Sequence, residues 1–511
     1  MLKKIRRLCD EKKTYVAVIA YVLIFISAIS LFDAPMAIGL FFIVCLTAIT
    51  FLILLIAGVH SKQIYGLFLL ALLVHVAAVL VIQYTGFRLG GGADFEGYHK
   101  SAVLIADRFS QGNFSLDEAG LLNDFPVAIA IVYMITTPAM IVGQLFTAFL
   151  AALSILLLYY IILEIGGSQK AAFLAGIAAV FYPSYLYFGS VLLKDTMVTP
   201  LALAGILLSA KMLKYFSRWY FLAFFTLLIA LTHLRFYVGL ALMFSFIISW
   251  FLIASFGARN KIVYGFAIVF LLGFAPQIAG SGYYGFDNFK EFLNAQKITA
   301  YREVTYNSTA IVPVLAPEPA PIPTPVPVPQ PAPVPQPQPA PASPYSQNML
   351  SGEGSSFVIE TGLGKGPLVF IKNSLLSFTY GLLGPFPWQI RYARQRVALL
   401  ETFPWYVMIA FFLVSLVRLV RQRGAKHALG LHRFAVPLLL FSLLAMGSLT
   451  LFINNYGIIT RIRIPVFMAL FAVMSIALSG PIEQIYEKVS PYWRRGVYRL
   501  PFIRSPFKAG Q

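Results

Sequence analysis

The stretch from position 90 to position 100 concentrates side chains that could do chemistry. It reads GGGADFEGYHK and holds two acids, Asp94 and Glu96, followed closely by Tyr98 and His99. The whole chain is 59% hydrophobic and only 12% charged. Ionisable groups beside a membrane-length apolar run therefore indicate a functional site more than an ordinary solvated loop. A carboxylate in such a loop could serve as a general base or help to hold a metal ion.

Further polar groups stand at the ends of other apolar segments. They are Lys194 with Asp195, His233 with Arg235, Arg461 with Arg463, and a weaker group formed by Arg391, Arg394 and Arg396. Arginine presents a planar fork of donors that suits phosphate oxygens, and together with carboxylates it predicts a phosphate-bearing lipid substrate. Interfacial anchoring of helix ends is an equally good explanation for Lys194 and the weaker arginine group. A hydrogen bond to a neighbouring helix would account equally well for His233.

The elements that must position these residues are membrane helices. A mean hydropathy of +0.78 excludes a soluble globular chain, and long apolar runs without strict alternation exclude a β-barrel. We therefore predict an all-α polytopic membrane protein with about twelve transmembrane helices. The expected spans are 14–32, 35–58, 64–84, 141–163, 171–193, 196–213, 218–234, 236–256, 262–280, 402–420, 433–453 and 464–480. We expect 125–139 and 367–383 to be re-entrant or interfacial helices in external loops.

The positive charges predict the orientation. The chain carries a net charge of +19, and most basic clusters fall in segments expected on one side of the membrane. The positive-inside rule then places both termini in the cytoplasm, with anionic lipid contact as a side effect of the charge. Nucleic acid is not needed to explain it. The predicted location is the cell inner (plasma) membrane, with the polar groups on the external or periplasmic side.

The predicted organisation has five parts. They are a cytoplasmic tail with two additional spans (1–63), a transmembrane module (64–280) with an external loop (86–124), a large external loop (281–401), C-terminal spans (402–482) and a basic tail (483–511). The large loop contains a proline-rich linker at 311–344, which should be an extended polyproline II tether. A passive spacer is favoured there over a partner-binding ligand. The two cysteines indicate neither a disulfide framework nor a metal site.

Short motifs in this order resemble a known family. They are GADFEGY at 92–98, YPS at 182–184 leading to LKD at 193–195, LR at 234–235 and RIRIP at 461–465. The sequence is similar here to the GT-C polytopic membrane glycosyltransferases, in particular the family 39-like group with protein O-mannosyltransferases and lipid A aminoarabinose transferases. The resemblance covers roughly 64–280. It departs from the family pattern at Asn123-Asp124, where many relatives have Lys or Glu, and in the two additional N-terminal spans and the proline insertion.

The resemblance implies transfer of a sugar from a polyprenyl-phosphate donor to a glycan, lipid or protein acceptor at the external face, with inversion. Asp94 matches the family's catalytic acid and would be the general base. Asp195, with Glu96 as the alternative, would orient the acceptor or a divalent cation. Asp94, Glu96 and Asp195 could bind such a cation, but it is not required. The other expected substrate-binding residues are Tyr98, His99, Lys194, His233, Arg235, Arg461 and Arg463, the last three on the donor phosphate.

Two other functions fit the same composition. One is a glycan ligase or polymerase that uses a diphosphate-linked oligosaccharide, and the other is a lipid or oligosaccharide transporter. We find no convincing internal repeat of the kind transporters show. The glycosyltransferase argument, like a ligase or polymerase, requires the polar groups to share the external side of the membrane. If 125–139 crossed the membrane, Asp195 and Arg235 would lie on the side opposite Asp94.

Overall fold

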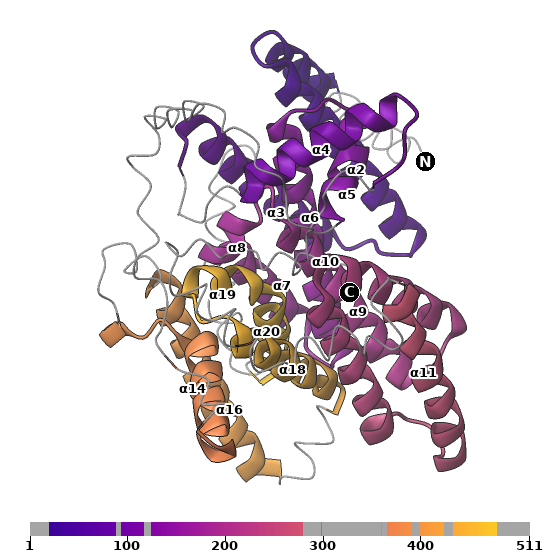
Figure 1. Cartoon of the computed structure of the whole chain (residues 1–511), viewed down its shortest axis with the longest axis vertical. Coiled ribbons are helices and arrows are strands. Elements are labelled where there is room, and N and C mark those ends of the chain that lie inside the picture. The colour runs from indigo at the N-terminus through magenta and orange to yellow at the C-terminus, as the bar shows by residue number, and fades with distance from the viewer. Residues whose placement is uncertain are drawn as a thin grey trace, which may run out of the picture.

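The computed structural model describes residues 20–87, 94–116, 124–278, 298, 359, 365–389, 399–423 and 433–477. These residues form helices and connecting turns, with no β-strand among them, so the predicted all-α class is confirmed for this part of the chain (Figure 1). Several expectations lie outside the described residues. They concern both termini, the glycines before Asp94, the proline-rich linker 311–344, and Arg391, Arg394 and Arg396.

The helices follow one another along the chain in two groups. After the short helix Ala20–Ser30 come α2 (Ala34–Ile56), α3 (Lys62–Thr85), α4 (Asp94–Ser110), α5 (Phe125–Ile135), α6 (Met140–Glu164), α7 (Gln169–Val180), α8 (Pro183–Phe188), α9 (Lys194–Lys214), α10 (Arg218–Ile253) and α11 (Ala258–Ile278). Then follow α14 (Pro367–Leu383), η4 (Pro387–Gln389), α16 (Leu399–Arg423), η5 (Arg433–Ala435), α18 (Val436–Phe452), α19 (Tyr456–Ile462) and α20 (Ile464–Ala477).

Six of the described helices are long and apolar enough to cross a membrane. They are α2, α3, α6, α9, α10 and α18 with the turn before it; α19 and α20, bent by 58°, form a seventh span if taken together. All lie where spans were predicted, and the chain is a multi-pass helical membrane protein. Other predicted spans correspond to shorter apolar helices, such as α7 and Leu399–Val414. Twelve spans therefore remain a prediction.

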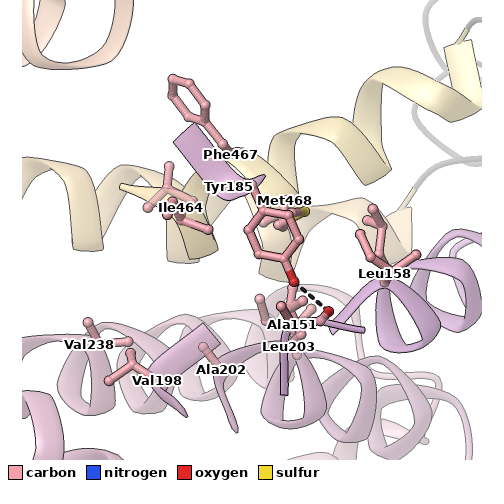
Figure 2. Close-up of a cluster of buried hydrophobic side chains, with 14 of the residues drawn as sticks. Ala151, Leu158, Tyr185, Val198, Ala202, Leu203, Val238, Ile464, Phe467 and Met468 are labelled. Carbon is pink, nitrogen blue, oxygen red and sulfur yellow. Dashed lines mark hydrogen bonds between the residues drawn. The ribbon is translucent and has the colours of Figure 1, made fainter. Parts of the chain in front are cut away.

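The centre of the bundle is α6. It packs against α2, α3, α7, α9 and α20, and most of its residues are buried. Tyr185 of α8 enters this core between α6 and α20, and its hydroxyl donates a hydrogen bond to the carbonyl oxygen of Ala151 at 2.6 Å (Figure 2). A buried tyrosine needs such a partner because its hydroxyl loses water on insertion. The contact fixes α8 and the segment after it to the rigid centre of the molecule.

The long helix α10 folds back on itself. Arg235 has non-helical backbone angles (φ −152°, ψ 89°), and the rings of Phe224 and Phe246 on its two sides have centroids 4.9 Å apart. In a straight helix, 22 residues would separate them by about 33 Å. The segments 218–234 and 236–253 are therefore antiparallel arms of a helical hairpin with Arg235 at its tip. This agrees with two separate segments predicted here.

The helices α5, α7 and α8 are each shorter than a span. The predicted span 171–193 is divided into α7 and α8, because Tyr182 is extended and Pro183 starts a new helix. Proline lacks the N–H for the preceding turn and disfavours helix at the residue before it. The 11 residues of α5 measure about 16 Å, roughly half of a hydrocarbon core. That length agrees with the prediction that 125–139 does not cross on its own.

Candidate functional site

Four segments that are distant in sequence meet through ion pairs. Arg461 places Nη1 2.7 Å from Oδ2 of Asp94 and Nε 3.0 Å from Oδ2 of Asp195. On its other side Asp195 lies 2.5 Å from Nη2 of Arg235, measured from Oδ1. The structure thus brings these four predicted site residues together. We call Asp94, Arg461, Asp195 and Arg235 the ionic chain.

Each member of the ionic chain is placed by a helix end. Asp94 and Asp195 lie in the first turns of α4 and α9, where the exposed N–H groups and the helix dipole favour negative charge. Arg235 is the non-helical tip of the α10 hairpin. Arg461 lies on the short helix α19, which Asn455 caps by accepting a hydrogen bond from the amide of Ile458 at 3.2 Å. All four residues therefore lie at one end of the bundle.

Exposure changes steeply along the ionic chain. Asp195 is 3% exposed, and the side chains of Arg235 and Arg461 are 9% and 15% exposed, whereas that of Asp94 is 50% exposed. Lys194 is partly buried within electrostatic reach of these groups. Three cations thus face two carboxylates, which leaves one net positive charge. The site offers an accessible carboxylate in front of a buried, positively charged wall.

Several buried atoms of the ionic chain are close in distance but poorly aligned. Nη2 of Arg235 and Nε of Arg461 lie within ion-pair distance of Asp195 but without good hydrogen-bond geometry, and Nε of Arg235 has no hydrogen-bond partner within the described residues. A buried donor without an acceptor costs roughly 1–3 kcal/mol. Oxygen atoms of a bound anion would satisfy these donors, and phosphate has the geometry that guanidinium forks match.

Tyr98 borders the ionic chain from α4. Its ring packs edge-on against Phe125 with centroids 5.2 Å apart. Burial is the main cause that raises the pKa of the Tyr98 hydroxyl, and the nearby negative charges of Asp195 and Asp94 also raise it. The hydroxyl therefore stays protonated at neutral pH and can donate a hydrogen bond to a ligand. Glu96 lies in the same first turn of α4 and is partly exposed.

The predicted site histidines connect helices around the ionic chain. Nδ1 of His99 lies 2.8 Å from the hydroxyl of Tyr133, which ties α4 to α5, and burial lowers the pKa of His99. Nδ1 of His233, near the α10 tip, lies 2.6 Å from Oδ2 of Asp124, which immediately precedes α5. Both members of the second pair are half-exposed. The structure thus gives both histidines a bridging position.

Arg463 belongs to a second, separate cluster that sequence reasoning missed. Its Nη2 lies 3.0 Å from Oε1 of Glu401, and its Nη1 donates to the carbonyl oxygens of Gly381 and Gly384 at 2.8 and 3.0 Å. The same carboxylate accepts hydrogen bonds from Tyr182, at 2.6 Å, and from Ser184. Glu401 and Arg463 are both buried. An acid at the start of an apolar segment was the available signal for Glu401.

The two carboxylates of the ionic chain do not fit a bridging metal ion as they are arranged. Arg461 lies between Asp94 and Asp195, so a cation shared by both would meet its positive charge. Among the described residues, no group of three or more His, Cys, Asp or Glu side chains gathers in a way that could hold a metal. No step below is routed through a metal.

Comparisons with protein-family models, with curated proteins and with solved structures find no match for this chain. Function is therefore argued from the residues themselves. The deciding features are the half-exposed carboxylate of Asp94 and the buried guanidinium groups beside it.

Proposed function

We propose that the protein is a membrane glycosyltransferase that moves a sugar from a polyprenyl-monophosphate donor to a hydroxyl of a glycan, lipid or protein acceptor. The observation that carries the proposal is the ionic chain, in which Arg461 touches both the exposed Asp94 and the buried Asp195. It combines a candidate base with donors for a phosphate leaving group. We further propose that the reaction occurs at the external face of the plasma membrane.

In the proposed step, Asp94 removes the proton from the acceptor hydroxyl as its oxygen attacks the anomeric carbon. The bond between that carbon and the phosphate oxygen breaks, and its electron pair leaves with the polyprenyl phosphate. Attack opposite the leaving group inverts the anomeric configuration. Arg235 and Arg461 stabilise the charge that grows on the phosphate, as preorganised donors do in a site of low dielectric. Asp195 holds both arginines in place.

Arg461 has a specific role in this order of events. In the structure its Nη1 is paired with Asp94, so one oxygen of that carboxylate is already engaged. A donor phosphate would compete for the same guanidinium, and the exchange would free Asp94 at the moment when the donor is bound. Binding of the donor would thereby make Asp94 available as the base, whereas water alone would leave Asp94 paired with Arg461.

We assign a positioning role to Arg463. Its Nη atoms are taken up by Glu401 and two backbone carbonyls in a buried environment. It lies directly after α19, two residues beyond Arg461. Anchoring Arg463 to Glu401 therefore fixes the orientation of α19 and the place from which Arg461 reaches the ionic chain.

Proteoliposomes containing the purified protein test the proposal. They would be given polyprenyl-monophosphate sugars labelled in the sugar, together with an envelope extract that supplies acceptors, and free polyprenyl phosphate would be measured by mass spectrometry. Asp94→Asn should lower its formation about 10²- to 10⁴-fold, the range for losing a general base. Asp107→Asn, an exposed acid on the same helix, is the matched control and should have no effect.

The same vesicles separate the other functions. Release of polyprenyl diphosphate from a diphosphate-linked oligosaccharide, with no use of monophosphate donors, would favour a ligase or polymerase. Passage of labelled substrate across the bilayer without covalent change would favour a transporter. Full activity of Asp94→Asn on a monophosphate donor would refute the assignment of the base.

A further inference from the structure

A polar cavity lies at the end of α9 opposite the ionic chain. It measures about 230 Å³ and is lined by residues from the last turns of α6 and α9, namely Tyr160, Leu163, Glu164, Leu207, Lys211 and Lys214. Because Asp195 lies in the first turn of α9, and Lys211 and Lys214 lie in its last turn, the two sites are separated by about 25 Å. This cavity is therefore independent of the proposed reaction.

The charge of the cavity favours an anion. Nζ of Lys214 lies 2.8 Å from Oε1 of Glu164 and also donates to that residue's backbone carbonyl, whereas Nζ of Lys211 is 3.6 Å from Oε2 and is more exposed. Lys214 and Arg433 both stand 4.7 Å from the ring of Phe434. Of the residues that line the cavity, two lysines thus face one acid, which leaves one net positive charge. Lys211 is the less tightly held of the two lysines.

The cavity also contains a polar atom without a partner. The hydroxyl of Tyr160 is buried and makes no hydrogen bond within the described part of the chain. A buried hydroxyl usually has a partner, so a ligand oxygen is a direct way to satisfy it. Tyr160, Lys211 and Lys214 all line this cavity. Together they could hold the oxygens of one phosphate group.

The surroundings favour a lipid over a free phosphate ion. Leu163 and Leu207 form an apolar wall of the cavity, at the ends of two helices apolar enough to cross a membrane. Tyr215 and Trp219, which follow α9, are exposed, as aromatic residues commonly are at a membrane–water interface. A headgroup placed at this level could leave its acyl chains along the apolar helix surfaces.

We propose that this cavity binds the phosphodiester headgroup of an anionic glycerophospholipid. Lys211 and Lys214 supply the charge, and Tyr160 donates a hydrogen bond to a phosphate oxygen. The bound lipid would cover the gap between α6 and α9 and hold their ends together.

Native mass spectrometry of the full chain tests this site. Protein reconstituted in nanodiscs of equal phosphatidylglycerol and phosphatidylcholine would be released, and the retained lipids would be counted. We expect retention of phosphatidylglycerol, reduced about five-fold by Lys211→Gln and again by Lys214→Gln, since each basic residue near a membrane surface contributes about that factor. Tyr160→Phe should weaken the retention of phosphatidylglycerol, because it removes the hydroxyl while keeping the aromatic ring. Lys62→Gln, an exposed cation at the start of α3, is the matched control and should leave retention unchanged.

Three results would overturn the proposal. They are equal retention of both lipids by the unaltered protein, a loss in Lys62→Gln as large as in Lys211→Gln, and displacement of the lipid by millimolar glycerol phosphate, which would identify a free-anion site. Helical circular dichroism checks that each variant is folded. If the double lysine variant does not fold, Tyr160→Phe and Lys211→Gln still decide between the outcomes.

Discussion

The buried pair of Glu401 and Arg463 offers the sharpest test of how the site is held. Glu401→Gln keeps the shape of the side chain but removes its charge. The Arg463 guanidinium then keeps only two backbone carbonyls and the ring of Phe467, whose centroid lies 4.4 Å from the arginine Cζ atom. Breaking a buried ion pair by removing one partner costs about 3–5 kcal/mol, because the other charge stays buried without compensation. The carbonyls and the ring offset part of that cost. We therefore expect Glu401→Gln to lower the free energy of unfolding by about 3 kcal/mol, near the lower end of that range.

The double variant Glu401→Gln with Arg463→Gln removes both charges and keeps amide donors and acceptors in place. It should be more stable than either single variant, with an interaction energy of about 3 kcal/mol. The free energy of unfolding would be measured by titration with a denaturing detergent in mixed micelles, followed by helical circular dichroism. Asp107→Asn controls for an exposed charge and should change stability by less than about 0.5 kcal/mol.

Two outcomes would refute this reasoning. A cost below about 1 kcal/mol for Glu401→Gln is typical of a solvated surface pair and would mean that water reaches it. Additive effects in the double variant would mean that the two charges do not depend on each other. In the same variants, the KM for donor should rise with a smaller change in kcat, because α19 would no longer hold Arg461 in place.

Three further predictions follow from the ionic chain and its neighbours. Arg461→Lys should raise the KM for a monophosphate donor about 10- to 100-fold, since one ammonium group cannot reach both carboxylates. Donor titrations measure this KM, and Arg218→Lys is the control variant. Tyr98→Phe should lower kcat/KM about five- to ten-fold in the same assay, by loss of one hydrogen-bond donor, and an unchanged value would remove the hydroxyl from the site. Burial holds the pKa of His99 below its ordinary value of 6.5, so the unfolded chain takes up the proton first as pH falls. Stability should therefore decrease as pH drops below 6.5, and unfolding midpoints should show a shallower decrease in His99→Gln.

Much of the helical framework could be predicted because apolar run length is a direct physical requirement of the bilayer. The segments 35–58, 64–84 and 141–163 match α2, α3 and α6 closely for this reason. The two segments separated at Arg235 were also predictable, since a charged residue interrupts the apolar run. Hydropathy failed at 171–193, where averaging passed over the helix-breaking effect of Pro183.

Pairing within the site was only partly predictable. Residue type and position at helix ends were enough to expect that Asp94, Asp195, Arg235 and Arg461 converge. They could not show that Arg461 would sit between two carboxylates, because that depends on the bend between α19 and α20. Nor could they assign Arg463 to Glu401, since the partner comes from another helix with no motif that connects them.

The long sequence separation between Asp195 and Arg461 has a consequence for biogenesis. Asp195 is buried, yet its partner Arg461 is translated on the order of half a minute later at 5–20 residues per second. Arg235 follows Asp195 much sooner, as the tip of the α10 hairpin. We therefore expect Arg235 to act as the interim counter-ion that lets the carboxylate enter the membrane. A chain that stops before α19 would insert most of the helices that precede it but could not assemble the site, so the ionic chain forms only after α19 has been synthesised.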